Sequence, residues 1–130
     1  MKKLLLMFVL VCSLLGGCGG GSDTAEKVFA DMAGNLREMS AILASVTDEA
    51  SAKAAVPQIE AVRAKMRDCA KRARAVPRPD AATEQRLNQT SQAVMAEIMP
   101  GLAADRARWA ARPELIAILG PALQGMENDL

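Results

Sequence analysis

The spacing of the apolar side chains constrains this chain more than any other feature, because it alternates between three and four residues. The first such series lies between about Thr24 and Val46 and consists of Phe29, Met32, Leu36, Met39, Leu43 and Val46. An α-helix turns once in about 3.6 residues, so this alternation places the series on one face, as in helices that pack against other helices. The sequence therefore predicts a helix over residues 24–46, with Thr24 as its N-cap.

A second helix is predicted from Thr47 or Asp48 to about Ala75. Its apolar residues keep the same alternation and are Ala52, Ala55, Ile59, Val62, Met66, Cys69, Ala73 and Val76. Either Thr47 or Asp48 can cap the start of this helix. Pro77 and Pro79 end it, because a residue that precedes proline is pushed out of the helical conformation.

A third helix is predicted from Asp80 to about Ala111, with a sparser apolar series of Leu87, Val94, Ile98, Leu102 and Trp109. A short fourth helix begins at Pro113, since proline is favoured at the first helical position, and extends to about Met126. The apolar residues of this last helix cover an arc of roughly 160°. They are Leu115, Ile116, Ile118, Leu119, Leu123 and Met126.

Three prolines, Pro57, Pro100 and Pro121, lie inside these segments on the side opposite the apolar face. Water on that side can satisfy the carbonyl that each proline frees, so we expect bent helices. In the alternative, Pro57 and Pro100 each begin a new helix. The predicted fold is all-α: a small antiparallel bundle of three long, proline-bent helices and a short terminal helix, following a cleaved signal peptide.

The N-terminus has basic residues followed by an apolar segment, the order found in an export signal. Lys2 and Lys3 precede an apolar run from Leu4 to Leu15. As a helix this run would be about 18 Å long, well short of the ~30 Å hydrocarbon core of a bilayer. We therefore expect the hydrophobic region of a signal peptide rather than a membrane-spanning helix.

The run ends in Leu15-Gly16-Gly17-Cys18, which resembles the lipobox of bacterial lipoproteins. The resemblance implies cleavage between Gly17 and Cys18 and lipid attachment to Cys18. It also implies the outer membrane, facing the periplasm, because Gly19 rather than aspartate follows the cysteine. In the alternative, an ordinary signal peptidase cuts near Gly16 and leaves Cys18 as a free thiol.

This interpretation divides the chain into three parts. Residues 1–17 are the signal peptide, residues 18–23 are the lipidated cysteine and a flexible glycine-rich leash, and residues 24–130 are the helical domain. Separately, residues 47–57 are similar to a stretch of exported helical proteins of bacteria that have no known activity. That similarity implies a helix and export, and nothing about chemistry.

Cleavage alters both the charge and the cysteine count. Loss of Lys2 and Lys3 lowers Lys plus Arg from 16 to 14 against 15 Asp plus Glu, so the mature side chains sum to −1. Nucleic-acid binders are usually strongly basic, and we expect none here. Cys12 leaves with the signal and Cys18 is acylated, so Cys69 has no partner for an intramolecular disulfide.

The sequence contains no recognisable catalytic constellation. It has no histidine, and Cys69 occupies an apolar seam, where a free cysteine packs as a small hydrophobe. An intermolecular disulfide and a redox or ligand role are the alternatives for Cys69. Glu60 with Asp68, and Asp105 near Glu97, are interpreted as solvated ion-pair faces. The methionines are interpreted as core rather than as a copper site. We therefore predict no enzyme, no cofactor and no metal.

The candidate contact residues lie in two basic clusters and in the last helix. One cluster runs from Arg63 to Arg78. The other contact candidates are Arg106, Arg108, Trp109, Leu115, Ile118 and Met126. An arginine face beside a tryptophan can bind anionic headgroups, peptidoglycan or an acidic protein surface. In the plainer interpretation, the arginines at the end of the second helix complement its dipole, Trp109 closes one end of the bundle, and Ile116, Leu119 and Leu123 cover it.

The leading hypothesis is a membrane-tethered, non-enzymatic helical lipoprotein of the bacterial envelope that acts by contact with an envelope protein or peptidoglycan. The alternative is a periplasmic protein that binds a small ligand or a metal between its helices. A third hypothesis is a toxin-neutralising or stress lipoprotein.

Overall fold

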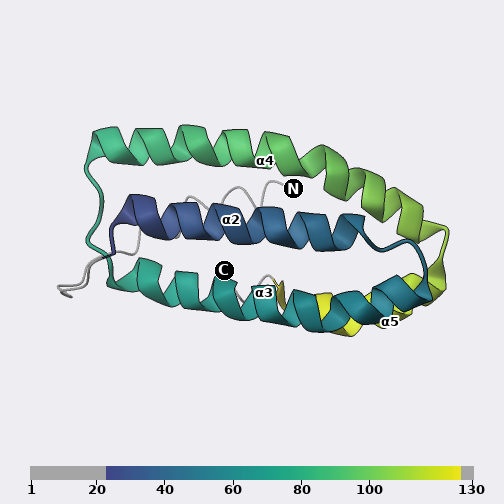
Figure 1. Cartoon of the computed structure of the whole chain (residues 1–130). Helices are drawn as coiled ribbons and strands as arrows, with labels where there is room; N and C mark the ends of the chain where they lie inside the picture. The colour runs from purple at the N-terminus through teal and green to yellow at the C-terminus, as the bar shows by residue number, and fades with distance from the viewer. Residues whose placement is uncertain (1–22, 127–130) are drawn as a thin grey trace.

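The computed structural model of the protein describes residues 23–126, which form four α-helices and no strand (Figure 1). The helices are α2 (Ala25–Ala44), α3 (Glu49–Ala75), α4 (Ala81–Ala110) and α5 (Pro113–Leu123). The small all-α bundle with three long helices and a short terminal one is thus confirmed. The predicted signal peptide, the lipobox and the leash up to Ser22 lie outside the described residues.

Each long helix begins where the sequence supplies an N-cap. The side chains of Thr24 and Asp80 each accept a hydrogen bond from the backbone N–H three residues further on, at 3.1 and 2.7 Å. Asp48 does the same with Ser51 at 2.8 Å, and the Ser51 hydroxyl in turn accepts from the Asp48 N–H at 3.0 Å. This reciprocal pair is a capping box, which satisfies two backbone donors that a helix start would leave without partners. Of the two proposed caps for α3, Asp48 is therefore the cap.

The last helix ends at Leu123 rather than at the predicted Met126. Gly125 has a φ of 77°, in the left-handed region that favours glycine. The Gln124 N–H donates to the Gly120 carbonyl at 2.8 Å and completes the last turn. A left-handed glycine just beyond the final turn is a common helix stop, so the early end follows from Gly125.

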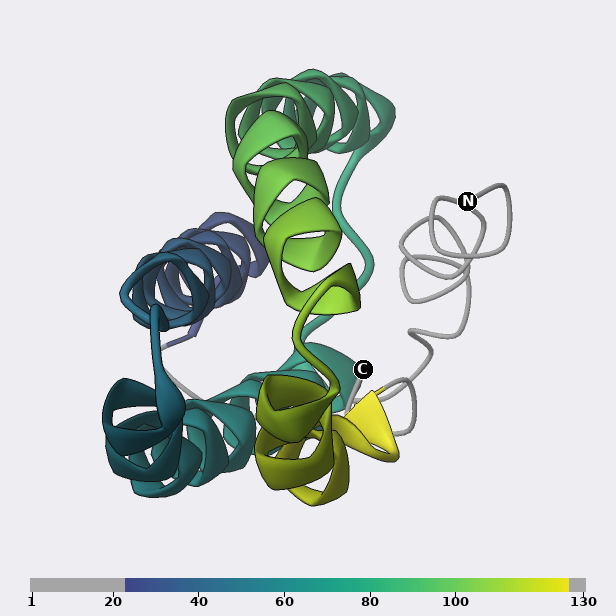
Figure 2. The same cartoon turned by 90° about the vertical axis from the view of Figure 1, so that its right-hand side faces the viewer.

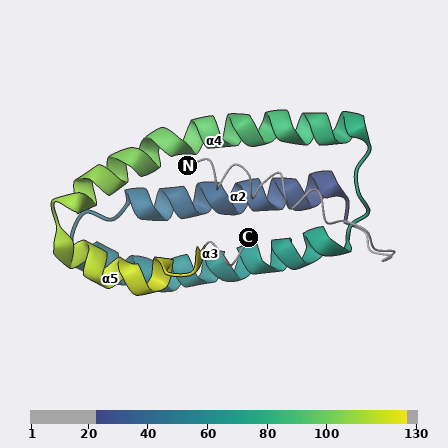
Figure 3. The same ribbon diagram turned by 180° about the vertical axis from the view of Figure 1, so that it is seen from behind.

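The internal prolines do not break their helices. Pro57, Pro100 and Pro121 all lie within continuous helices and all are exposed. Figures 1 and 3 show α4 curving towards α5 along its C-terminal part, the part of the helix that contains Pro100. An exposed proline allows this curvature because water can bind the freed carbonyl. The alternative in which Pro57 and Pro100 start new helices is wrong.

The pairs of helices differ in how extensively they pack against each other. α2 packs against both α3 and α4, and α5 packs against α3 and, less extensively, against α4. Viewed along the bundle, α4 stands on the opposite side of α2 from α3 (Figure 2). The main core is formed where α2, α3 and α5 meet, and consists of Met39, Leu43, Val46, Ala52, Ala55, Ile59, Val62, Met66, Leu115, Leu119 and Ala122.

A second, smaller cluster lies at the end of the bundle where α2 begins and α3 finishes. It consists of the buried residues Val28, Cys69 and Val76, with Ala25, Met32 and Ala73 packed against them. Cys69 is only 3% exposed, in agreement with its predicted core position. Phe29, predicted for the seam, is half-buried, and its neighbour Val28 takes the interior place. The apolar core is therefore thin at this end.

Candidate functional site

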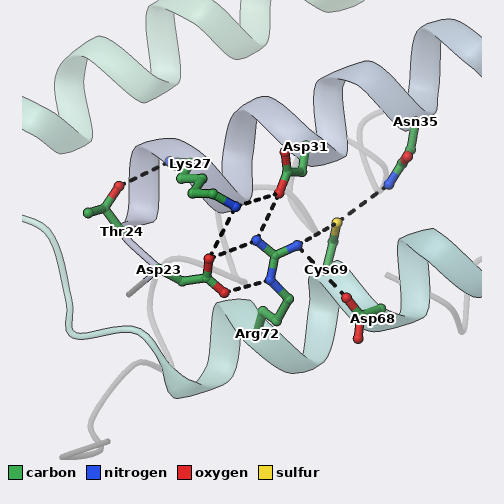
Figure 4. A network of polar contacts seen from close by, with 8 residues as sticks. All are labelled: Asp23, Thr24, Lys27, Asp31, Asn35, Asp68, Cys69 and Arg72. Carbon is green, nitrogen blue, oxygen red and sulfur yellow. Dashed lines mark hydrogen bonds and ion pairs between the residues drawn. The ribbon is translucent and has the colours of Figure 1, made fainter. Parts of the chain in front are cut away.

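The clearest concentration of chemistry lies at this thin end of the core, between the start of α2 and the end of α3 (Figure 4). We call it the Arg72 network, and it comprises Asp23, Lys27, Asp31, Asn35, Asp68, Cys69 and Arg72. Arg72 lies in the last turn of α3, and its guanidinium points across to α2. The network joins the two helices at the end of the bundle where they share few apolar contacts.

Arg72 binds two carboxylates of the α2 segment. Its Nε donates to Asp23 Oδ2 at 2.6 Å and its Nη2 donates to Asp23 Oδ1 at 2.9 Å, a two-bond arrangement typical of strong arginine–carboxylate pairs. Nη2 also donates to Asp31 Oδ2 at 2.8 Å. The Arg72 side chain is only a quarter exposed. Asp23, the residue just before the Thr24 cap, is thus fixed to α3.

The charges in this network perturb one another in the direction that the geometry predicts. The hydrogen bonds from Arg72 lower the pKa of Asp23 from its ordinary 3.8 to about 2. They also lower the pKa of Asp31, and the two carboxylates raise the pKa of Arg72. Lys27 lies 3.4 Å from Asp23 and 3.5 Å from Asp31, on the same face of α2. The two carboxylates are therefore ionised throughout the neutral range.

Cys69 is held beside this network as a buried thiol. Its Sγ accepts a hydrogen bond from Asn35 Nδ2 at 3.4 Å and lies 3.9 Å from Arg72 Nη1. Burial raises the pKa of Cys69 and outweighs the opposing effect of Arg72. The thiolate is the nucleophilic form of cysteine, so this environment makes Cys69 unreactive at neutral pH. Lys65, one turn before Cys69 on α3, pairs with Glu38 at 2.8 Å.

An open groove runs along the outer surface between α2 and α3, beside the network. The small residues Ala30, Gly34 and Ala64 leave it shallow and wide. The Lys65–Glu38 ion pair lines it, and so do Arg72, Asp31 and Asp68. The two cations and three acids of this lining are paired with one another, so no unpaired positive charge faces the groove.

The residues predicted as partner contacts at the end of α4 bind the connection between α2 and α3 instead. Arg108 Nη2 donates to the Ala44 carbonyl at 3.3 Å, and Trp109 Nε1 donates to the Val46 carbonyl at 3.5 Å. Arg112 donates to the Thr47 carbonyl. These donors satisfy carbonyls at and just beyond the end of α2, where a helix leaves acceptors without partners. This is the plainer interpretation of Trp109, as a closure of the bundle end.

Arg106 is different, because it is exposed and makes no ion pair or side-chain hydrogen bond within residues 23–126. Asp105, interpreted from the sequence as part of a solvated face, is 4% exposed. Its Oδ1 accepts from Arg108 Nη2 at 2.8 Å, while its Oδ2 has no hydrogen-bond partner in the described part of the chain. The interpretation of Asp105 as a solvent-facing acid is therefore wrong.

The residues predicted as contacts on α5 are packed against the bundle. Leu115 has no exposed surface, so the expectation that it stays partly exposed is wrong. Ile118 and Met126 are half-buried and pack against the main core. Ile116, which was expected to help cover the bundle, is 51% exposed. The residues that α5 buries fully are Leu115, Leu119 and Ala122, and Ile118, Leu123 and Met126 pack beside them against the main core.

Gly17 and Cys18, the predicted cleavage and lipidation residues, lie outside the described residues. Sequence reasoning missed Asp23, Asp31 and Asn35. A signal for the two acids was present, because Asp23, Lys27 and Asp31 follow one another at intervals of four and so share one side of the chain. Asn35 carried no such signal, since a polar residue beside an apolar seam is ordinarily solvated.

No helix in residues 23–126 is long and apolar enough to cross a membrane. The same residues contain no group of three or more histidine, cysteine, aspartate or glutamate side chains placed to hold a metal ion. Comparison of the chain with protein-family models, with curated proteins and with solved structures finds no match.

Proposed function

We propose that this protein is a lipid-anchored lipoprotein of the bacterial envelope whose helical bundle is a non-enzymatic interaction module. The observation that carries the proposal is the short distance along the chain between the lipobox and the folded domain. Cys18 ends the lipobox, and Asp23 is already bound to Arg72 of α3. An anchor is thus followed almost at once by a domain that has its own core.

The distribution of apolar side chains supports a domain that stays in water beside the membrane. Its large apolar residues turn inward, and Ile116 is the one exposed large hydrophobic residue in residues 23–126. Attachment to the bilayer would then rest on the lipid at Cys18. Two or more acyl chains give durable attachment, because each buried CH₂ contributes about 0.8 kcal/mol. The Gly19 that follows the cysteine favours the outer membrane, with the bundle in the periplasm.

Action by contact is supported by what the reactive and charged side chains do. Cys69 is buried, and the Asn35 amide donates to its sulfur. Arg108 and Trp109 bind backbone carbonyls of the same chain. These side chains stabilise the bundle. A function would therefore depend on other residues, which are exposed on its outer surface. An envelope protein or peptidoglycan is the partner class that the proposed location offers.

The anchor is tested by labelling growing cells with a radioactive or clickable fatty acid. The wild-type chain should incorporate the label and sediment with membranes, and Cys18→Ser should do neither. Cys12→Ser is the matched control, since it removes another cysteine from the same signal and should leave labelling intact. Acylation of Cys18→Ser, or its unchanged sedimentation with membranes, would refute the lipoprotein proposal.

The contact role is tested by crosslinking in intact cells followed by purification of the wild-type protein. A defined envelope partner or a peptidoglycan fragment, lost when Cys18→Ser releases the protein from the membrane, supports the module. Recovery of the monomer with a stoichiometric small ligand or metal would contradict it and favour the ligand-binding alternative.

A further inference from the structure

We propose that the end of the bundle where α2 starts and α3 finishes faces the bilayer, and that Lys71 and Arg74 there bind anionic lipid headgroups. This inference rests on the proposed lipid anchor at Cys18. It adds a second contact with the membrane and a fixed orientation of the bundle. One end of the bundle lies on the membrane and the other end points away from it.

The first step is the length of the leash. Five residues separate Cys18 from Asp23, and an extended chain spans at most about 3.6 Å per residue, so Asp23 lies within about 18 Å of the lipidated cysteine. α2 has 20 residues, which gives it a length of about 30 Å. The end that carries Asp23 is therefore the end nearest the membrane. The leash alone still permits the bundle to lie on its side.

The second step is the attachment of the leash to the bundle. Arg72 binds both carboxylate oxygens of Asp23. The chain that leads to the anchor is therefore joined to α3 as well as to α2. This attachment keeps the first turn of α2 folded and the leash short. The C-terminal turns of α3, with Lys71 and Arg74, are fixed beside the point where the leash begins.

The third step is the charge that this end presents. Its acids have partners: Arg72 pairs with Asp23 and Asp31 and lies 3.8 Å from Asp68, Glu26 pairs with Arg86 at 3.2 Å, and Glu84 pairs with Arg78 at 3.6 Å. Asp80 caps α4 by accepting from the Thr83 N–H at 2.7 Å. Lys71 and Arg74 are exposed on one face of α3 and have no acidic partner within residues 23–126. They are two exposed cations outside the ion pairs of the membrane-proximal end.

The fourth step is the size of the effect. A basic residue close to an anionic bilayer shifts a binding equilibrium about fivefold, so Lys71 and Arg74 together shift it about 30-fold. Such attraction would not recruit a free protein. On an anchored protein the contact is intramolecular, because the leash already holds the bundle at high local concentration. The lipid would supply the attachment, and the two cations would choose the orientation.

The orientation can be measured with the single tryptophan of the chain. Trp109 binds the Val46 carbonyl in the connection between α2 and α3, at the far end of the bundle. The mature lipidated protein is placed on vesicles that carry a dansyl lipid, and energy transfer from Trp109 to the lipid reports the distance of the far end. One set of vesicles is phosphatidylcholine alone, and the other contains 30 mol% phosphatidylglycerol.

We expect less transfer on the anionic vesicles, because there the bundle stands with Trp109 away from the surface. Lys71→Glu with Arg74→Glu should raise the transfer to its value on phosphatidylcholine, and so should 0.5 M salt with the wild-type protein. Lys53→Glu with Arg106→Glu, at the other end, is the matched control and should leave transfer low. Helical circular dichroism of both variants checks that they are folded.

Equal transfer on both vesicle types, or transfer that neither charge reversal nor salt changes, would overturn the orientation while leaving the anchor in place. Flotation of the same samples separates the two proposals. A lipidated protein floats with vesicles of either composition. A protein that floats with neither lacks the anchor, and both proposals then fail together.

Discussion

Replacement of Leu115 by alanine will test whether α5 belongs to the core or is a detachable docking element. Leu115 has no exposed surface and lies in the main core, whereas its neighbour Ile116 is 51% exposed. The two side chains are similar in size and lie on the same helix. Leu115→Ala and Ile116→Ala therefore form a matched pair in which only burial differs.

The magnitude follows from the atoms removed. Leucine to alanine deletes three carbons, which at about 0.8 kcal/mol each gives ~2.4 kcal/mol for lost burial. The cavity left behind adds to this, within the ~2–5 kcal/mol found for buried leucines. α5 lies at one end of the bundle and can partly settle into the space, so we expect about 3 kcal/mol for Leu115→Ala. For Ile116→Ala we expect less than about 1 kcal/mol, since alanine also favours the helix by a few tenths.

The measurement is urea unfolding of the domain from Ser22 onward, followed by circular dichroism at a helical wavelength. With a slope of about 1.5 kcal/mol per molar urea, Leu115→Ala should lower the midpoint by about 2 M. Ile116→Ala should lower it by less than half as much. Equal shifts for the two variants, or a larger shift for Ile116→Ala, would show that α5 is not packed through Leu115 and would return Leu115 to the partner surface.

Three further predictions follow from the polar contacts. Cys69 should react slowly with a thiol reagent in buffer and rapidly in denaturant, because burial raises its pKa; rapid labelling of the native protein would place it at the surface. The pKa of Asp23 is lowered to about 2, so its pairing contributes stability above pH 3.8 that is lost as the pH falls towards 2. The stability difference between wild type and Asp23→Asn, measured by thermal melts, should therefore shrink over that range; a constant difference contradicts the ion pair. Arg108→Ala should destabilise by about 2–3 kcal/mol because it leaves the buried carboxylate of Asp105 without its donor. The double variant with Asp105→Ala should recover part of that loss in urea unfolding, and additive losses would argue against the pair.

The helices were predictable from the sequence because their signals are local. The alternation of three and four residues, the caps and the exposed side of each proline all depend on neighbours within two turns. The seam of α3 shows this well: Ala52, Ile59 and Met66 are all fully buried, as their spacing predicts. The early end of α5 is the exception, because a glycine near a helix end does not reveal its φ in the sequence.

The candidate site was predictable only in part, because it depends on which helices meet and on how far long side chains reach. Arg72 lies three residues from Cys69 along α3, and its short hydrogen bonds go to Asp23, which belongs to another segment of the chain. Asp105 looked like a surface acid, yet it is only 4% exposed in the folded bundle. Periodicity gives the direction of a side chain around its own helix. It does not say which partner will lie there.

The unequal packing of α4 has a consequence for how the molecule opens. α2 and α3 follow one another along the chain, share the core and are joined by a short capped connection. α4 packs on α2 and meets α5 towards its C-terminal end, and among residues 23–126 it is not in extensive contact with α3. Regions with few buried contacts open at the lowest free energy. The N-terminal half of α4 should therefore detach first as a cooperative unit, and its amide hydrogens should exchange with solvent before those of the α2–α3 hairpin.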